Sequence, residues 1–295
     1  MKQTKRNMLI NKNFILISVL LFSMFAGCGP KTEAPFLAEL GVCTGFTNAE
    51  MLAGHGYTFV EETVGRFLVP DKSDQEFDSI LQVARQAVLP VKACNSFIPG
   101  RLKSVGPEAD HPAVLAYMET ALKRAGQAGV EHIVFGSGGS RGIPEGFPRD
   151  EARRQFIELC KAMAPIAEKY NVIVVLEPLN TKEVNFVNSV AEGGEIVEEV
   201  NHPNFRLLAD LYHMKMEDEG PENIIKYGHL IKHTHIAEKQ ERAAPGRFGE
   251  DFTPYFEALK KINYQGRMAV ESRWTDLEAE SAKAIETMKA QIQNL

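Results

Sequence analysis

Residues 172–180 read VIVVLEPLN, and the interpretation of the whole chain starts from this stretch. Five apolar residues lead directly to a carboxylate, Glu177, and a proline then ends the pattern. A run this apolar is typical of a parallel strand that is buried on both faces. A carboxylate at the end of such a strand is costly to bury without a partner. The stretch therefore predicts a central strand with a functional group at its end.

The same kind of apolar run recurs along the chain and alternates with amphipathic helical segments. Strands are expected at 39–45, 57–63, 88–95, 130–137, 172–177, 205–211, 231–237 and 267–271. Helices are expected at 75–86, 112–128, 149–170, 190–200, 222–227 and 253–261. This alternation predicts a parallel sheet with crossover helices, and eight units in about 250 residues match the size of a (β/α)8 TIM barrel. A doubly wound open sheet is the alternative, but no glycine-rich dinucleotide fingerprint follows the first strand.

The first 27 residues have a different composition. Residues 1–13 are basic and contain no acid, and residues 14–26 are apolar but short for a membrane span. The sequence 25–28, Phe-Ala-Gly-Cys, resembles a bacterial lipobox, which implies cleavage before Cys28 and attachment of lipid to it. We expect a signal peptide at 1–27, a lipidated tether at 28–37 and a single catalytic domain at 38–295. The chain would be exported and anchored on the periplasmic side of a bacterial membrane; an uncleaved membrane anchor is the alternative.

The charge of the chain argues against a nucleic-acid partner. Removal of residues 1–27 takes away four basic side chains and no acidic one, which leaves 29 basic against 39 acidic residues and a net charge of −10. Nucleic-acid binding requires a basic surface. Besides Cys28, the cysteines are Cys43, Cys94 and Cys160; they have no metal-like spacing and are expected to be free thiols.

Four of the expected strands end on side chains that can bind a metal: Glu177, Asp210, His235 and Glu271. The carboxyl ends of barrel strands meet at one mouth, where barrel enzymes have their active sites. Three carboxylates and one imidazole suit manganese, cobalt, magnesium or zinc, and a divalent cation would remove the cost of burying these charges. The alternative is four separate polar strand ends, each solvated or ion-paired.

The motifs that carry these residues resemble the sugar phosphate isomerase/epimerase superfamily, which consists of xylose isomerase-like TIM barrels and includes the ketose 3-epimerases. The motifs are LEPLN, ADLYHM, HTHIAE followed by RAAPG, and VES, and the match extends from about Gly41 to the end of the chain. The resemblance implies one metal held by the four residues above, with Glu177 and Glu271 also acting as an acid/base pair.

The resemblance also implies that Glu183, His213 and Arg242 contact the substrate. The arginine is one residue further from the histidine than in the ketose epimerases, although its spacing to the Pro-Gly that follows is kept. Two loops, SFIPGRLKSVGP and FGSGGSRGIPEGF, are similar to those of a branch that includes enzymes acting on keto-sugar glycosides.

The expected activity is sugar isomerisation or epimerisation, which begins with removal of a proton beside a carbonyl and is assisted by a divalent ion. One alternative is a lyase or hydratase that makes the same first step on a 3-keto-glycoside and then eliminates the neighbouring oxygen. Another is a non-catalytic carbohydrate-binding lipoprotein, and a third is a zinc endonuclease, which the acidic surface opposes. The partner is a small sugar; its identity, the metal and the oligomeric state are left open, and a homo-oligomer is allowed.

Three further features receive weaker interpretations. Glu61 and Glu62 end the second strand, and one of them is a candidate for substrate contact. His233 is expected to be a hydrogen-bonded histidine in the barrel interior, one layer below His235. The glycines at 136, 138 and 139 are interpreted as a flexible rim loop, with a phosphate cradle as the alternative.

Overall fold

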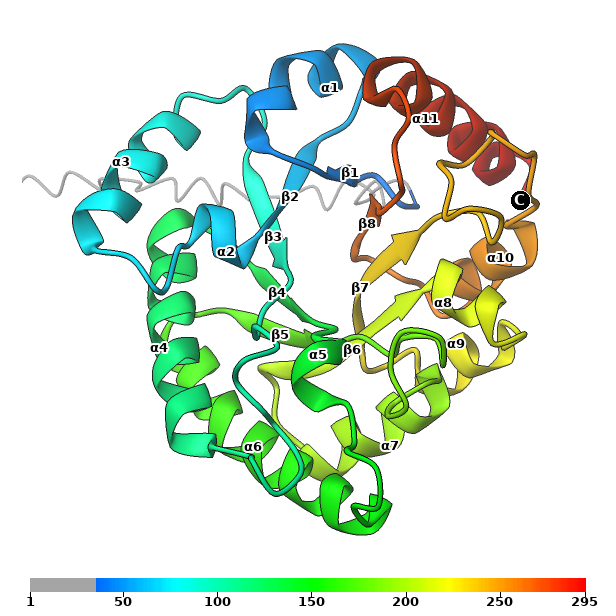
Figure 1. Cartoon of the computed structure of the whole chain (residues 1–295). Helices are drawn as coiled ribbons and strands as arrows, with labels where there is room; N and C mark the ends of the chain where they lie inside the picture. The colour runs from blue at the N-terminus through cyan, green and yellow to red at the C-terminus, as the bar shows by residue number, and fades with distance from the viewer. Residues whose placement is uncertain (1–35) are drawn as a thin grey trace, which may run out of the picture. The chain divides into compact units, whose positions relative to one another are not determined.

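A computed structural model describes residues 36–295, which form a closed barrel of eight parallel strands in the order β1 to β8 (Figure 1). The last strand pairs with the first, with Gly41 opposite Ala269, and this pairing closes the barrel. The TIM-barrel prediction is therefore confirmed. The predicted signal peptide and Cys28 lie outside the described residues.

All eight expected strands are present, and each is slightly shorter than expected. Their bounds are β1 Leu40–Cys43, β2 Phe59–Thr63, β3 Val91–Asn95, β4 His132–Phe135, β5 Ile173–Leu176, β6 Phe205–Asp210, β7 Ile231–Ile236 and β8 Arg267–Val270. The difference concerns only the ends, where the chain leaves the sheet and enters the rim loops.

The expected helices are also present and surround the barrel (Figure 1). They are α3 Asp74–Ala84, α4 His111–Ala128, α6 Arg149–Lys169, α7 Val190–Val200, α9 Glu222–Tyr227 and α10 Thr253–Lys261. Short helices lie in the loops: η1 Phe46–Asn48, α2 Val64–Phe67, α5 Gly138–Arg141 and α8 Leu211–Met216.

These short helices were not predicted, and neither were two longer ones, α1 Ala49–His55 and α11 Leu277–Gln293, which pack against each other beside the closing strand pair. The sequence carries a signal for α11, because Asp276 precedes it and accepts a hydrogen bond from the backbone of Ala279 at 3.1 Å. Apolar residues at Ala284, Ile285 and Met288 then form its buried face.

The apolar residues form two separate clusters. The large one lies between the strands and the helices, and Leu37, at the end of the predicted tether, is part of it. The small one comprises Val134, Val175 and Leu208, with Ile173 packed against it. Because these residues alternate with the outward-facing ones along β4, β5 and β6, the small cluster lies in the barrel interior. Val175 and Ile173 thus share the face on which Glu177 was expected.

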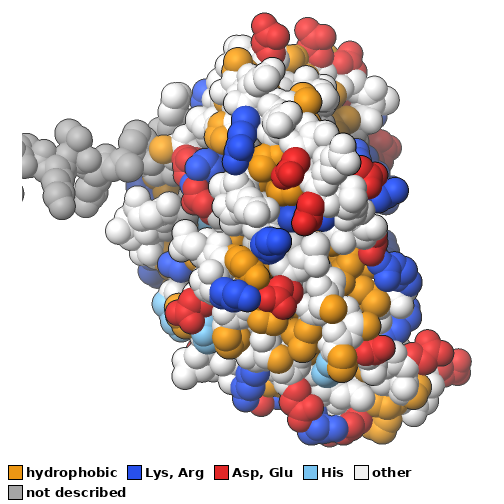
Figure 2. Space-filling model, turned by 90° about the vertical axis from the view of Figure 1, so that its left-hand side faces the viewer, with side chains coloured by type: hydrophobic (Ala, Val, Ile, Leu, Met, Phe, Trp, Pro, Cys, Tyr) orange, Lys and Arg blue, Asp and Glu red, His pale blue; other side chains and the backbone are white. Residues whose placement is uncertain are grey.

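The outer surface is mixed in charge. On the face shown in Figure 2, which carries α3 and α4, acidic and basic side chains are interspersed. Within residues 36–295, none of the helices combines the length and the apolarity that a bilayer crossing requires. Cys94 and Cys160 are buried and Cys43 is partly buried, and all three are free thiols, as expected.

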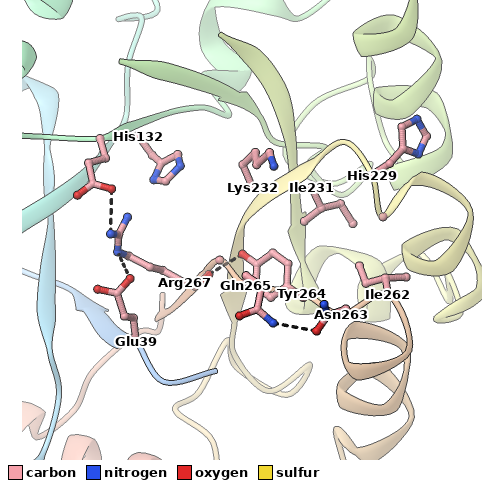
Figure 3. Close-up of a pocket in the computed structure, with 13 residues that line it drawn as sticks. Glu39, His132, His229, Ile231, Lys232, Ile262, Asn263, Tyr264, Gln265 and Arg267 are labelled. Atoms are coloured by element: carbon pink, nitrogen blue, oxygen red, sulfur yellow. Dashed lines mark hydrogen bonds and ion pairs between the residues drawn. The ribbon is translucent and has the colours of Figure 1, made fainter. Parts of the chain in front are cut away.

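At the amino-terminal mouth of the barrel, a cavity of about 440 Å³ is bordered by an ion-pair network (Figure 3). Arg267 at the start of β8 lies between two carboxylates: its Nε is 2.8 Å from Glu39 Oε2, and one Nη is 2.9 Å from Glu131 Oε2. Lys92 Nζ pairs with the other oxygen of Glu131 at 2.7 Å. In TIM barrels this mouth contributes to stability, and the active site lies at the opposite end.

We expect Arg267→Gln to lower the free energy of unfolding by about 1–2 kcal/mol, because two carboxylates lose their shared counter-charge. Urea unfolding would measure the loss. The control is Arg101→Gln, which removes an exposed pair with Asp71 and should cost less than about 1 kcal/mol. Equal effects of the two substitutions would contradict a structural role for Arg267.

Candidate active site

The structure brings Glu177, Asp210, His235 and Glu271 together at the carboxyl-terminal mouth. One ligand atom from each lies within 4.8 Å of the others. Glu177 and Glu271 directly follow β5 and β8, while Asp210 ends β6 and His235 is next to last in β7. The four strands are consecutive in the barrel, so their ends are neighbours. Glu177, Asp210 and His235 are buried, and Glu271 is partly exposed to the cavity.

His235 lies at the centre of this group. Its Nδ1 is 2.9 Å from Glu177 Oε1 and 3.3 Å from Glu271 Oε2. Its other nitrogen, Nε2, is 3.0 Å from Glu61 Oε1. One edge of the imidazole therefore faces the carboxylates of the site, and the other faces the barrel interior.

Asp210 contributes to this group a carboxylate oxygen without a hydrogen bond. Its Oδ1 accepts a hydrogen bond from the backbone of Tyr212 at 2.7 Å, which caps α8. Its Oδ2 is buried without a hydrogen-bond partner. A buried carboxylate oxygen with no donor is unfavourable unless a cation or a ligand satisfies it. The donor set and this oxygen fit a divalent cation; the role of the four residues as its ligands stays a prediction.

The two glutamates of the site have opposite pKa shifts. Burial and the charge of Glu271 raise the pKa of Glu177. Burial would also raise the pKa of Glu271, but the charges of Arg242 and His235 outweigh it and hold this pKa at about 2. Two nearby carboxyl groups whose pKa values diverge can divide the acid and base roles between them.

Arg242 lies beside Glu271 and pairs with its Oε2 through Nη2. The same nitrogen is 3.7 Å from Asp210 Oδ2, and Nη1 is 3.4 Å from Glu183 Oε1. The guanidinium also lies 4.7 Å from the centre of the Tyr212 ring. Arg242 therefore connects the predicted metal ligands to Glu183.

His213 is held with a defined orientation. Its Nδ1 accepts a hydrogen bond from the backbone N–H of Asn180 at 3.1 Å, so the ring proton belongs on Nε2. Nε2 is 3.5 Å from Asp210 Oδ2. His213, Glu183 and Arg242 all line the cavity described next, and their contact with substrate stays a prediction.

The cavity above the four residues has a volume of about 670 Å³. Glu177, Glu271, Glu183, His213 and Arg242 form one side of it. The other side consists of residues at the ends of β2, β3 and β4 and in the segments that follow them, namely Thr63, Gly65, Arg66, Asp71, Asn95, Ser96, Ile98, Pro99, Gly136, Ser137 and Gly138, together with Tyr117 of α4. This size is typical of a pocket for a small organic molecule.

Two residues of the site were not identified from the sequence. Asn95, the last residue of β3, donates from Nδ2 to Glu271 Oε1 at 3.2 Å. Gly136, directly after β4, lies against Glu177: a Cβ at this position would be 2.3 Å from Glu177 Oε2. Both stand at strand ends, the same signal that identified the acidic residues. Gly136 lies in the rim loop, as expected, and makes room for a carboxylate. The rim-loop interpretation is corrected for Gly138 and Gly139, which belong to the short helix α5.

The interpretation of Glu61 and Glu62 is also corrected. Glu61 is 1% exposed and lies below the cavity, where it contacts His233 and His235. Glu62 accepts hydrogen bonds from Arg66 and from the backbone of Thr63. Neither residue lines the cavity. His233 is hydrogen-bonded in the barrel interior, as expected.

Residues 49–291 match the model of the xylose isomerase-like TIM barrel family. The chain belongs to this family. The structures it resembles include a crystal structure of 3-keto-D-glucoside 4-epimerase from Escherichia coli, with a TM-score of 0.74 and 19% identity over 85% of this chain and 99% of that one. At this identity the similarity concerns the fold.

Two curated relatives are sugar epimerases. L-ribulose 3-epimerase of Methylomonas sp. is 30% identical over 171 residues, which are 55% of this chain and 58% of the relative. A probable ketose 3-epimerase of Synechocystis sp. is 26% identical over 245 residues, 79% of this chain and 84% of the relative. The match thus spans just over half of the Methylomonas enzyme and most of the Synechocystis protein.

Proposed function

We propose that this member of the family is a divalent-metal-dependent sugar isomerase or epimerase. The observation that carries the proposal is the position of Glu177 and Glu271, which flank His235 at the floor of one cavity and have opposite pKa shifts. The curated relatives named above act on ketoses, which supports the same class of activity.

Each residue of the site has a part in this proposal. Glu177, Asp210, His235 and Glu271 would hold the ion, and the ion would stabilise the enediolate that forms when the proton is lost. One glutamate takes the proton from the carbon beside the carbonyl, and the other, in its protonated form, donates a proton to the opposite side of that carbon. His213 and Arg242 can donate hydrogen bonds to sugar oxygens, and Glu183 can accept one.

The second candidate function is a lyase or hydratase acting on a 3-keto-glycoside. Loss of the same proton would be followed by departure of the oxygen on the neighbouring carbon with its electron pair. The cavity, about 670 Å³, is large enough for a glycoside as well as for a free ketose. A relative from E. coli, 29% identical over 42% of this chain, is a 3-dehydro-D-guloside 4-epimerase, so a keto-glycoside is also compatible with epimerisation.

The test is a substrate panel in heavy water. The metal-loaded full chain is incubated with free ketohexoses and with 3-keto-glycosides, and the products are followed by NMR. An epimer or isomer supports the first function, and a released aglycone supports the second. Deuterium at the carbon beside the carbonyl indicates an enediolate. If no sugar turns over with any of the four metals, the enzyme proposal is wrong and a carbohydrate-binding role gains support.

We also propose that the chain is an exported lipoprotein, anchored through Cys28 on the periplasmic side of the membrane. Sugar phosphates are mostly cytoplasmic, so this location favours free sugars, glycosides or their oxidised derivatives as substrates. Association into a homo-oligomer stays a prediction, which light scattering would test.

A cell expressing the full chain should incorporate a fatty-acid probe into this protein, because lipid would be attached to the Cys28 thiol. Cys28→Ala should abolish the label and leave the signal peptide uncleaved. Cys160→Ala is the control: this thiol is buried in the barrel domain and should not affect labelling. Wild-type protein without label would rule out the lipoprotein.

A further inference from the structure

Glu61 is the most enclosed carboxylate near the site. It lies in β2, inside the barrel, and its side chain is inaccessible to solvent. Its Oε2 is 2.7 Å from His233 Nε2, and its two oxygens are 3.0 and 3.1 Å from His235 Nε2. One buried carboxylate therefore contacts two imidazoles, and one of them belongs to the predicted metal set.

We infer that Glu61 is a positioning residue that holds His235 with its proton on Nε2 and its Nδ1 lone pair directed at the metal position. The inference rests on the proposed metal set. A neutral imidazole carries one N–H, and the partner of one nitrogen decides which nitrogen keeps it. The Glu61 carboxylate only accepts hydrogen bonds, so it keeps the proton on Nε2. The opposite edge, Nδ1, faces Glu177 and Glu271, and its lone pair would be available to a cation bound between these carboxylates.

His233 stabilises this arrangement from below. It provides a second N–H for Glu61, and its ring stacks on His132 with centres 5.6 Å apart and an interplanar angle of 9°. The ring of His235 meets that of His233 edge to face at 5.1 Å. Glu61 is thus fixed by two donors, and neither it nor His235 can rotate without breaking a buried hydrogen bond.

The same residues allow one competing assignment. Cys43, Glu61 and His235 also offer ligand atoms within 4.8 Å of one another and could form a second metal position. The oxygens of Glu61 already accept from two imidazoles, which favours the positioning role. The two assignments differ in stoichiometry: one metal per chain for positioning, two for a second site.

The first test is calorimetry with Mn²⁺ on the full chain. Wild type should bind one ion. Glu61→Gln should bind it 10- to 100-fold more weakly. Glutamine keeps one accepting oxygen but carries no charge, and its N–H₂ replaces the second acceptor, so the two imidazole N–H groups can no longer both be accepted as before and the orientation of His235 and the position of its proton are less firmly held. The visible spectrum of the Co²⁺-loaded variant should differ from that of wild type, because the ligand geometry has changed.

The matched control is Glu62→Gln. Glu62 is the next residue and is also buried, but it contacts Arg66 and the backbone of Thr63. All three hydrogen bonds to Glu62 go to one oxygen, and the amide oxygen of glutamine can take its place. The Mn²⁺ affinity of Glu62→Gln should equal that of wild type. A similar loss in both variants would assign the effect to general destabilisation and overturn the inference.

The second test needs no substitution. In ¹H–¹⁵N spectra of the zinc-loaded wild-type protein, His235 should carry its proton on Nε2 and bind zinc through Nδ1. Binding through Nε2, or two ions per chain, would overturn the inference. The failures are distinguishable: if wild type binds no metal, the proposed function fails, whereas unchanged affinity in Glu61→Gln overturns only the role of Glu61.

Discussion

Glu271→Gln should lower turnover by roughly 10²-fold or more while most of the metal stays bound. Glutamine keeps the size of the side chain and one oxygen for the ion, but it cannot accept a proton. Steady-state kinetics on the substrate found in the panel would give the rate, and elemental analysis would give the metal content.

His235→Ala is the comparison for Glu271→Gln, because in His235→Ala the loss of activity should follow from the loss of metal. This substitution removes a ligand from the centre of the group, so metal is lost first and activity is lost with it. Deuterium exchange adds a second readout: Glu271→Gln could still exchange the proton through Glu177 without completing turnover. Near-full activity of Glu271→Gln with metal bound would make the two-glutamate mechanism wrong.

Gly136→Ala should lower kcat/KM by roughly 10²-fold, because a shift of about 1 Å in a reacting group can cost this much. The added Cβ would be 2.3 Å from Glu177 Oε2, so the carboxylate has to move. The backbone of Gly136 does not have a positive φ, and alanine can adopt its conformation. The loss should therefore come from displacement of Glu177. Kinetics and Mn²⁺ calorimetry would measure it.

Gly54→Ala is the matched control. Gly54 is in α1, and a Cβ there would meet nothing within 4 Å. Alanine in a helix is more favourable than glycine by about 0.5–1 kcal/mol, so this variant should be at least as stable as wild type and fully active. If Gly136→Ala is as active as Gly54→Ala, then the close packing of Gly136 against the Glu177 carboxylate has no importance for catalysis.

The barrel could be predicted because its signals are local. Several strands are short apolar runs, as in VIVVLEPLN, and the long crossover helices show the helical spacing of apolar residues. Helix α11 was missed although its spacing and its cap are also local. The convergence of Glu177, Asp210, His235 and Glu271 followed from the barrel itself, because parallel strands bring their carboxyl ends to one mouth.

The residues around these four depended on the tertiary structure. Glu61 is 174 residues from His235 and Asn95 is 176 residues from Glu271, and no pattern along the chain connects such pairs. They meet because the barrel closes β1 onto β8, which brings the first half of the chain next to the second. Strand periodicity determines which residues face the interior, but strand order, stagger and closure determine which of them touch. The sequence by itself therefore determined the barrel and the residues at its mouth, and only the tertiary structure decided which side chains hold those residues in place.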